Sequence, residues 1–131
     1  MDWTFPCELE SNYDGDTFRL ALDIGFGMKY YAPVRLHGVD TPELRGGTDA
    51  TKALAAKARD EAEKLIRSSE TVIFHSLVWR GKYGRPVGDI ECDGIMLSNY
   101  LIDARLGVPY DGGSREEIQE YHAANAEFHG F

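Results

Sequence analysis

The chain has 131 residues, 43% of them hydrophobic, so it can bury one substantial core and is too short for two. We therefore expect a single domain over residues 1–131. With 27% charged and 11% aromatic residues and no low-complexity tract, the composition excludes an intrinsically disordered chain. The net charge of −8 is opposite in sign to that of most proteins that grip a phosphate backbone. The charge is uneven, however, because residues 80–85 hold three cations, whereas residues 106–131 hold five acids and one base.

No stretch of the sequence approaches the roughly 20 apolar residues of a membrane-spanning helix. The first residues, Met-Asp-Trp-Thr-Phe, lack the basic and apolar regions of a secretory signal, so we expect a cytoplasmic protein that contacts no membrane. Cys7 and Cys92 lack metal-binding spacing, and a chain of this length folds without a disulfide, which favours free thiols. Size alone predicts a monomer.

The first third of the chain has the pattern of β-strands. Residues 3–39 alternate polar positions such as Thr17 and Arg19 with an apolar face that includes Phe18, Leu20 and Leu22. The segment 25–27, Gly-Phe-Gly, predicts a hairpin. A third strand is expected over about 29–38, in which Pro33 indicates a bulge or an edge position.

A helix and two more strands follow. Thr48 or Asp49 can cap a helix that ends near Arg67, because apolar residues recur at helical spacing: Leu54, Ala58, Ala62 and Leu65 or Ile66. A strand from Thr71 to Trp79 then turns through residues 80–84 into another strand over 85–92, which ends at an Asp-Gly turn.

Two helices complete the predicted order. Ser98 can cap a short helix that stops before Gly107 and Pro109, and a last helix is expected over about 114–128. The order β-β-β-α-β-β-α-α predicts an α+β, mainly β fold: a five-stranded Greek-key barrel of the OB type with three helices.

Two carboxylates flank a glycine in the segment Asp14-Gly15-Asp16-Thr17, at the predicted start of a strand. Asp-Gly pairs are common in tight turns for backbone reasons alone, and this structural interpretation stays open. The functional alternative is that the turn aims one carboxylate, preferably that of Asp16, towards a cation.

Residues 35–43, Arg-Leu-His-Gly-Val-Asp-Thr-Pro-Glu, place a guanidinium, two carboxylates and a hydroxyl group at the end of a strand. The breaks at the glycine and the proline would let Asp40 and Glu43 converge. Acids that converge on Arg35 indicate an anionic substrate, whereas an ordinary ion pair is the structural alternative.

Residues 80–85, Arg-Gly-Lys-Tyr-Gly-Arg, combine three cations and an aromatic ring in a glycine-containing turn. A flexible backbone there would let the side chains wrap a phosphate group. A solvated hairpin tip is the alternative for this segment taken alone.

Together the three segments resemble the thermonuclease family, typified by staphylococcal nuclease, from Tyr13 to about Tyr121. They occur in the order usual for that family, separated by its strand, helix and strand elements. The resemblance implies calcium bound by the carboxylates of Asp16 and Asp40 and the main-chain carbonyl of Thr41. Because these ligands are oxygens and no His or Cys cluster competes, a hard cation is favoured over zinc; magnesium or manganese would accept the same atoms.

The resemblance also implies catalytic roles. Glu43 would orient or deprotonate the attacking water, while Arg35 and Arg85 would clamp the phosphoryl oxygens. Positions that hold a neighbouring phosphate and stack on a base are matched by Lys82, Tyr83 and Tyr110. A core position is the alternative for the last of these.

The resemblance thus implies a calcium-dependent nuclease that hydrolyses phosphodiester bonds of DNA or RNA by in-line attack of water. The acidic C-terminal region favours a short single-stranded or frayed substrate over duplex DNA. Two alternatives remain: a non-catalytic OB module that binds nucleic acid or a protein, and a phosphodiesterase for small phosphate esters. Retention of the metal-type acids, the candidate base and both arginines favours the enzyme.

Overall fold

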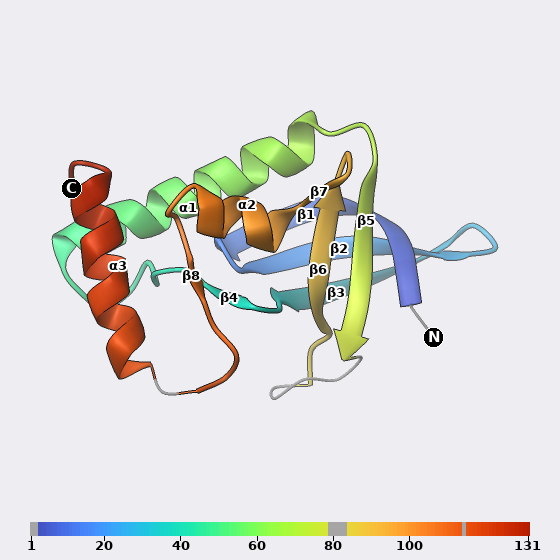
Figure 1. Cartoon of the computed structure of the whole chain (residues 1–131). Helices are drawn as coiled ribbons and strands as arrows, with labels where there is room; N and C mark the ends of the chain where they lie inside the picture. The colour runs from blue at the N-terminus through green and yellow to red at the C-terminus, as the bar shows by residue number, and fades with distance from the viewer. Residues whose placement is uncertain (1–2, 79–83, 114) are drawn as a thin grey trace.

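A closed β-barrel forms the centre of the computed structural model, which describes residues 3–78, 84–113 and 115–131 (Figure 1). Its strands are β1 (Trp3–Asp14), β2 (Thr17–Gly25), β3 (Met28–Leu36), β5 (Val72–Val78) and β6 (Val87–Cys92). They follow the order β3-β2-β1-β5-β6, and the parallel pairing of β3 with β6 closes the barrel. The predicted OB-type architecture with three helices is therefore confirmed.

The barrel interior follows from the alternation in the strands. Phe18, Leu20 and Leu22 of β2 are at most 1% exposed, whereas Arg19 between them faces solvent. Successive side chains of a strand point to opposite faces, so alternate residues of β3, β5 and β6 also face the interior. These buried residues are Ala32, Val34, Leu36, Phe74, Ile90 and Cys92. The predicted inward and outward faces of β2 are confirmed.

The predicted hairpin joins β2 and β3, where Gly25, Phe26 and Gly27 all have positive φ. Pro33 pairs with β2 alone, because β3 pairs with β6 only at Arg35 and Leu36 among the described residues. The edge position predicted for this proline is confirmed. A proline is tolerated there because it cannot donate to a second neighbouring strand.

The helix α1 (Asp49–Ser68) lies along the barrel and begins at the predicted cap. Thr48 and Thr51 form a reciprocal capping box, in which the Thr48 hydroxyl accepts from the Thr51 amide. Its buried face includes the apolar positions expected from their spacing, namely Leu54, Ala58, Ala62 and Ile66. α1 also covers the turn between β1 and β2: a Cβ at Gly15 would lie 3.0 Å from the Cβ of Ala58.

The helix α2 (Leu97–Asp103) follows β7 (Ile95–Met96), and its predicted cap is wrong. The N-cap residue is Met96, without a side-chain hydrogen bond, while Ser98 lies inside the helix. The Ser98 hydroxyl instead bonds the carboxylate of Asp89 on β6. A partner from a neighbouring strand has therefore replaced the local capping interaction.

The helix α3 (Glu116–Phe128) packs beside α1 and near β8 (Figure 1). Residue 114, the predicted start of this helix, lies outside the described residues. The two-residue strands β4 (Val39–Asp40) and β8 (Val108–Pro109) pair antiparallel between the barrel and α3. Both were missed by the sequence analysis.

Two further expectations can be compared with the structure. Cys7 and Cys92 are both free, as expected. Within the described residues, no helix has the length and apolar character needed to cross a membrane.

Candidate functional site

One guanidinium joins two acids that come from separate segments. Nη1 of Arg35 lies 3.3 Å from Oδ2 of Asp16, and its Nη2 lies 3.4 Å from Oδ1 of Asp40. Arg35 stands near the end of β3, Asp16 in the turn after β1, and Asp40 in β4. The two carboxylates are only 6% and 2% exposed, so their charges depend on such partners. The structure thus brings together three of the residues selected from the sequence.

The backbone around Arg35 fixes the direction of its side chain. Nη1 donates to the carbonyl oxygens of Leu36 at 2.9 Å and Val39 at 3.0 Å. Both carbonyls face it because the chain reverses at Gly38, whose φ of +82° favours glycine. Among the described residues, the recorded Arg35 side-chain contacts use Nη1 and Nη2, which leaves Nε–H available to a ligand.

Thr41 is the next residue of the site and is 1% exposed. Its backbone N–H donates to Oδ2 of Asp16 at 2.9 Å, which ties the 35–43 segment to the turn after β1. Its hydroxyl oxygen is buried without a hydrogen-bond partner among the described residues. The segment therefore has a spare buried oxygen next to two acids.

Asp14 adds a third carboxylate to this region. Burial and the nearby charge of Asp16 raise its pKa from 3.8 to about 6, against the lowering effect of the Leu44 backbone N–H. Its Oδ1 is buried without a hydrogen-bond partner in the described part of the chain. The close approach of α1 favours glycine between Asp14 and Asp16, so the turn serves both structure and the placement of Asp16.

The helix α3 reaches the same site through two residues that the sequence analysis missed. Nε2 of His122 lies 2.8 Å from Oδ2 of Asp40, and this histidine is completely buried. Nη2 of Arg115 lies 3.0 Å from Oδ1 and 3.1 Å from Oδ2 of the same carboxylate. Asp40 is therefore held from β3 by Arg35 and from α3 by Arg115 and His122.

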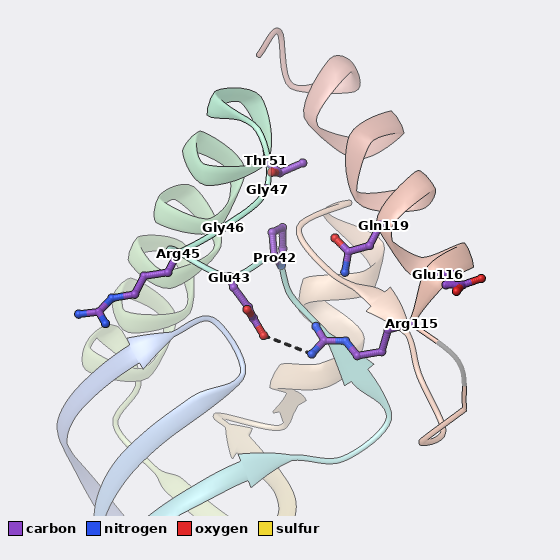
Figure 2. Close-up of a pocket in the computed structure, with 9 residues that line it drawn as sticks. All are labelled: Pro42, Glu43, Arg45, Gly46, Gly47, Thr51, Arg115, Glu116 and Gln119. Carbon is purple, nitrogen blue, oxygen red and sulfur yellow. Dashed lines mark hydrogen bonds and ion pairs between the residues drawn. The ribbon is translucent and has the colours of Figure 1, made fainter.

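Arg115 also reaches the candidate base. Its Nη1 lies 3.2 Å from Oε1 of Glu43, the contact drawn as a dashed line in Figure 2. Burial lowers the pKa of Arg115, but the charges of Asp40 and Glu43 outweigh this effect and raise it. The guanidinium consequently stays charged and bridges two acids of the site.

Signals for these two residues exist in the sequence, although they are weak. His122 is four residues from Ile118 and from Ala126, and all three lie on the buried face of α3. A cation at the start of a helix, such as Arg115, opposes the helix dipole and indicates an acidic partner. Neither signal identifies Asp40 as that partner, because 75 and 82 residues separate the pairs.

Glu43 stands on the loop that leads into α1 and has a side chain that is 60% exposed. It lines a pocket of about 640 Å³ between this loop and α3 (Figure 2). The pocket is also lined by Pro42, Arg45, Gly46, Gly47, Thr51, Arg115, Glu116 and Gln119. Solvent can therefore reach the carboxylate that was selected as the candidate base.

The remaining predicted site residues are less completely described. Arg85 is half-buried just before β6. The carbonyl of the next residue, Pro86, accepts a hydrogen bond from the Arg35 amide at 3.0 Å, so the backbones at Arg35 and Arg85 lie close together in space. Lys82 and Tyr83 lie outside the described residues. Tyr110 is half-buried rather than in the core, and its hydroxyl donates to the Gly113 carbonyl at 3.0 Å.

The donor chemistry of the site fits a hard cation. Two carboxylates meet at one guanidinium, and Thr41, whose amide donates to Asp16, has a buried hydroxyl oxygen without a hydrogen-bond partner among the described residues. The described residues contain no cluster of three or more His, Cys, Asp or Glu side chains arranged for a metal. A cation would thus depend on Asp16, Asp40, main-chain oxygen and water, and it would share Asp40 with positively charged side chains.

Comparison with known proteins identifies the family. The family model described as staphylococcal nuclease homologue matches residues 33–128, which is most of the chain. This range contains Arg35, Asp40, Glu43, Arg85 and the part of α3 that carries His122. No curated protein matches the chain. From the matched range, with a barrel and three helices arranged as described, we conclude that the chain belongs to the staphylococcal nuclease homologue family.

Proposed function

We propose that this protein is a calcium-dependent nuclease that cleaves phosphodiester bonds in DNA or RNA. The observation that carries the proposal is the continuous set of contacts from Asp16 through Arg35 to Asp40, and from Asp40 through Arg115 to Glu43. It supports a single reaction centre because acids and guanidinium groups from the turn after β1, from β3 and β4, from the loop before α1 and from the start of α3 meet there. Family membership supports the same reaction class.

Asp16, Asp40 and the main-chain carbonyl of Thr41 would hold the calcium ion. When bound, the ion would polarise the phosphoryl group and offset its negative charge. The oxygen-only ligands support calcium over zinc, and the small number of protein ligands leaves positions for water and substrate.

Glu43 would accept a proton from a water molecule as the water oxygen attacks phosphorus in line with the leaving oxygen. Its exposed carboxylate beside the pocket supports this role, because water has access to it. Attack places additional negative charge on the non-bridging oxygens. Nε–H of Arg35 and the guanidinium of Arg85 would donate hydrogen bonds to those oxygens, and the leaving oxygen would be protonated by solvent.

The substrate we favour is a short single-stranded or frayed segment of nucleic acid. A net charge of −8 opposes long-range attraction of duplex DNA. Arg35 and Arg85, whose backbones lie close together in space, would instead provide local positive charge for one phosphate. Tyr110 is available for stacking on a base, which is tolerant of sequence.

The test is hydrolysis of denatured DNA, RNA and a small phosphodiester, each with calcium or with a chelator. We expect calcium-dependent cleavage of the nucleic acids that Glu43→Gln and Arg85→Ala each reduce by about 100-fold or more. Glu63→Gln and Arg67→Ala are matched controls, because these residues pair with each other on the exposed face of α1. They should cleave like the wild type.

A second measurement separates the metal from the chemistry. Calcium should raise the melting temperature of the wild type, and Asp16→Asn and Asp40→Asn should abolish this shift. A calcium shift without cleavage of any substrate would leave a metal site and refute the enzyme. Nucleic-acid binding without turnover would instead identify a non-catalytic module, and cleavage of the small diester alone would identify a phosphodiesterase for small esters.

A further inference from the structure

Glu43 lies in a segment that provides little support of its own. Between β4 and α1, residues 41–48 form neither helix nor strand, and Gly46 and Gly47 both have positive φ. The Glu43 side chain is 60% exposed, so packing does not select one rotamer. A proton acceptor must nevertheless stand within hydrogen-bond distance of the attacking water, and small displacements reduce the rate strongly.

Arg115 supplies the contact that this carboxylate lacks. Within the described residues, the recorded side-chain partner of Glu43 is Nη1 of Arg115, at 3.2 Å. Figure 2 shows the Arg115 side chain reaching from the start of α3 to Glu43, and both residues line the pocket. By contrast, Arg45 lines the same pocket but points away from Glu43.

The other end of the Arg115 guanidinium is attached to a buried and well-supported group. Its Nη2 lies 3.0 Å and 3.1 Å from the two oxygens of Asp40. Asp40 is 2% exposed and is itself held by His122 and Arg35. The exposed loop is therefore connected through one planar group to the most buried part of the site.

We propose that Arg115 is a positioning residue of the nuclease centre, which holds the Glu43 carboxylate in place by bridging it to Asp40. The inference rests on the proposed function and extends it to a residue of α3. The guanidinium suits this role because its Nη groups diverge in one plane and can bind two carboxylates at once. A lysine at the same position has one charged centre and would hold one acid at a time.

A direct role in substrate binding would have different consequences. A phosphate-binding arginine contributes to affinity, so its loss raises KM and reduces the salt dependence of binding. A positioning residue acts through Glu43, so its loss lowers kcat and has no further effect once Glu43 is inactive. These outcomes can be measured separately.

The kinetic experiment uses single-stranded DNA with calcium. We expect Arg115→Ala to lower kcat by about 10–100-fold with KM within about twofold of the wild type, and Arg115→Lys to restore part of the loss. In a Glu43→Gln background, Arg115→Ala should change kcat by less than about twofold. Arg45→Ala removes an equal charge from the same pocket and should cleave like the wild type. The proposal would be overturned if Arg115→Ala and Arg45→Ala lowered kcat equally, or if Arg115→Ala raised KM. It would also be overturned if Arg115→Ala lowered kcat as much in the Glu43→Gln background as in the wild type.

Hydrogen exchange tests the positioning without relying on cleavage. Arg115→Ala should increase the exchange rates of the backbone amides of residues 43–47 by at least about threefold, while barrel amides remain protected. Arg45→Ala should leave both sets unchanged. If the wild type cleaves no substrate but this change occurs, the nuclease function fails and the positioning stands. Unchanged exchange in residues 43–47 refutes the positioning, whatever the activity.

Discussion

Replacing Arg35 with methionine tests whether its guanidinium holds the two buried acids together. Methionine keeps much of the length and apolar character of the stem but removes the charge. Asp40 would retain Arg115 and His122 as partners. Among the residues that the structure describes, Asp16 would retain only uncharged donors, the Thr41 amide at 2.9 Å and the Thr17 hydroxyl at 3.2 Å. The cost should therefore fall mainly on Asp16.

The distances give an estimate of that cost. At about 3.4 Å and an effective dielectric constant of about 20, one ion pair gains roughly 5 kcal/mol before desolvation is considered. Desolvation cancels much of this gain, and removal of one partner from a buried pair typically costs about 3–5 kcal/mol. Because Asp40 keeps two side-chain partners, we expect Arg35→Met to reduce the free energy of unfolding by about 3 kcal/mol, near the lower end of that range.

Urea unfolding in chelator-containing buffer measures this loss, which corresponds to a midpoint shift of about 1–3 M for a domain of this size. Adding Asp16→Asn should recover about 2 kcal/mol in the Arg35→Met background, because the uncompensated carboxylate is then gone. Arg59→Met is the control, since Arg59 pairs with the exposed Asp60 and should cost less than about 1 kcal/mol. A loss below about 1 kcal/mol for Arg35→Met, or an equal effect of Asp16→Asn in both backgrounds, would refute the reasoning.

Two further changes test the surroundings of the site. The raised pKa of Asp14, about 6 against 3.8, means that its proton stabilises the fold fully below pH 3.8 and that this stabilisation is lost as the pH rises through about 6. In chelator-containing buffer, Asp14→Asn should therefore melt at a higher temperature than the wild type at about pH 8. If Asp14→Asn still melted higher below about pH 4, ionisation of Asp14 would not be the cause of the difference. Gly107→Ala would place a Cβ 2.6 Å from Cγ2 of Val39 and 3.2 Å from the carbonyl oxygen of Asp40. Calorimetry should show a loss of about 1–3 kcal/mol that Val39→Ala partly relieves, whereas strictly additive losses would exclude this contact as the cause.

The sequence was sufficient for the elements whose pattern extends over several residues. β2 alternates in and out along its length, and α1 combines a helical repeat with the Thr48 cap, so both were predicted close to their observed bounds. The two-residue strands β4 and β8 are too short to have a period, and they form because α2 brings residue 108 back to Asp40. Ser98 was misassigned as a cap because the competing acceptor, Asp89, lies on β6.

The site residues likewise divide into those that local motifs predict and those that depend on long-range contacts. Asp16, Arg35 and Asp40 occur in two short motifs whose meeting follows from the pairing of β2 with β3, so their proximity was predictable. Arg115 and His122 meet Asp40 only through the packing of α3 beside α1 and β8, which no local spacing specifies. Long-range packing of helices was therefore the missing information.

The acidic residues of α3 lie on its exposed face, whereas its buried face carries a histidine. Glu117, Glu120 and Glu127 are exposed, and they are three of the 22 acidic residues whose excess over 14 basic residues opposes long-range attraction of nucleic acid. The buried face carries His122, and Arg115 precedes the first turn, so the same helix directs its positive and hydrogen-bonding groups towards Asp40. Screening by salt acts strongly on the exposed charges and weakly on the buried ones. The net charge of the chain consequently describes its long-range interaction with a nucleic acid and not the electrostatics around Asp40 in the candidate site.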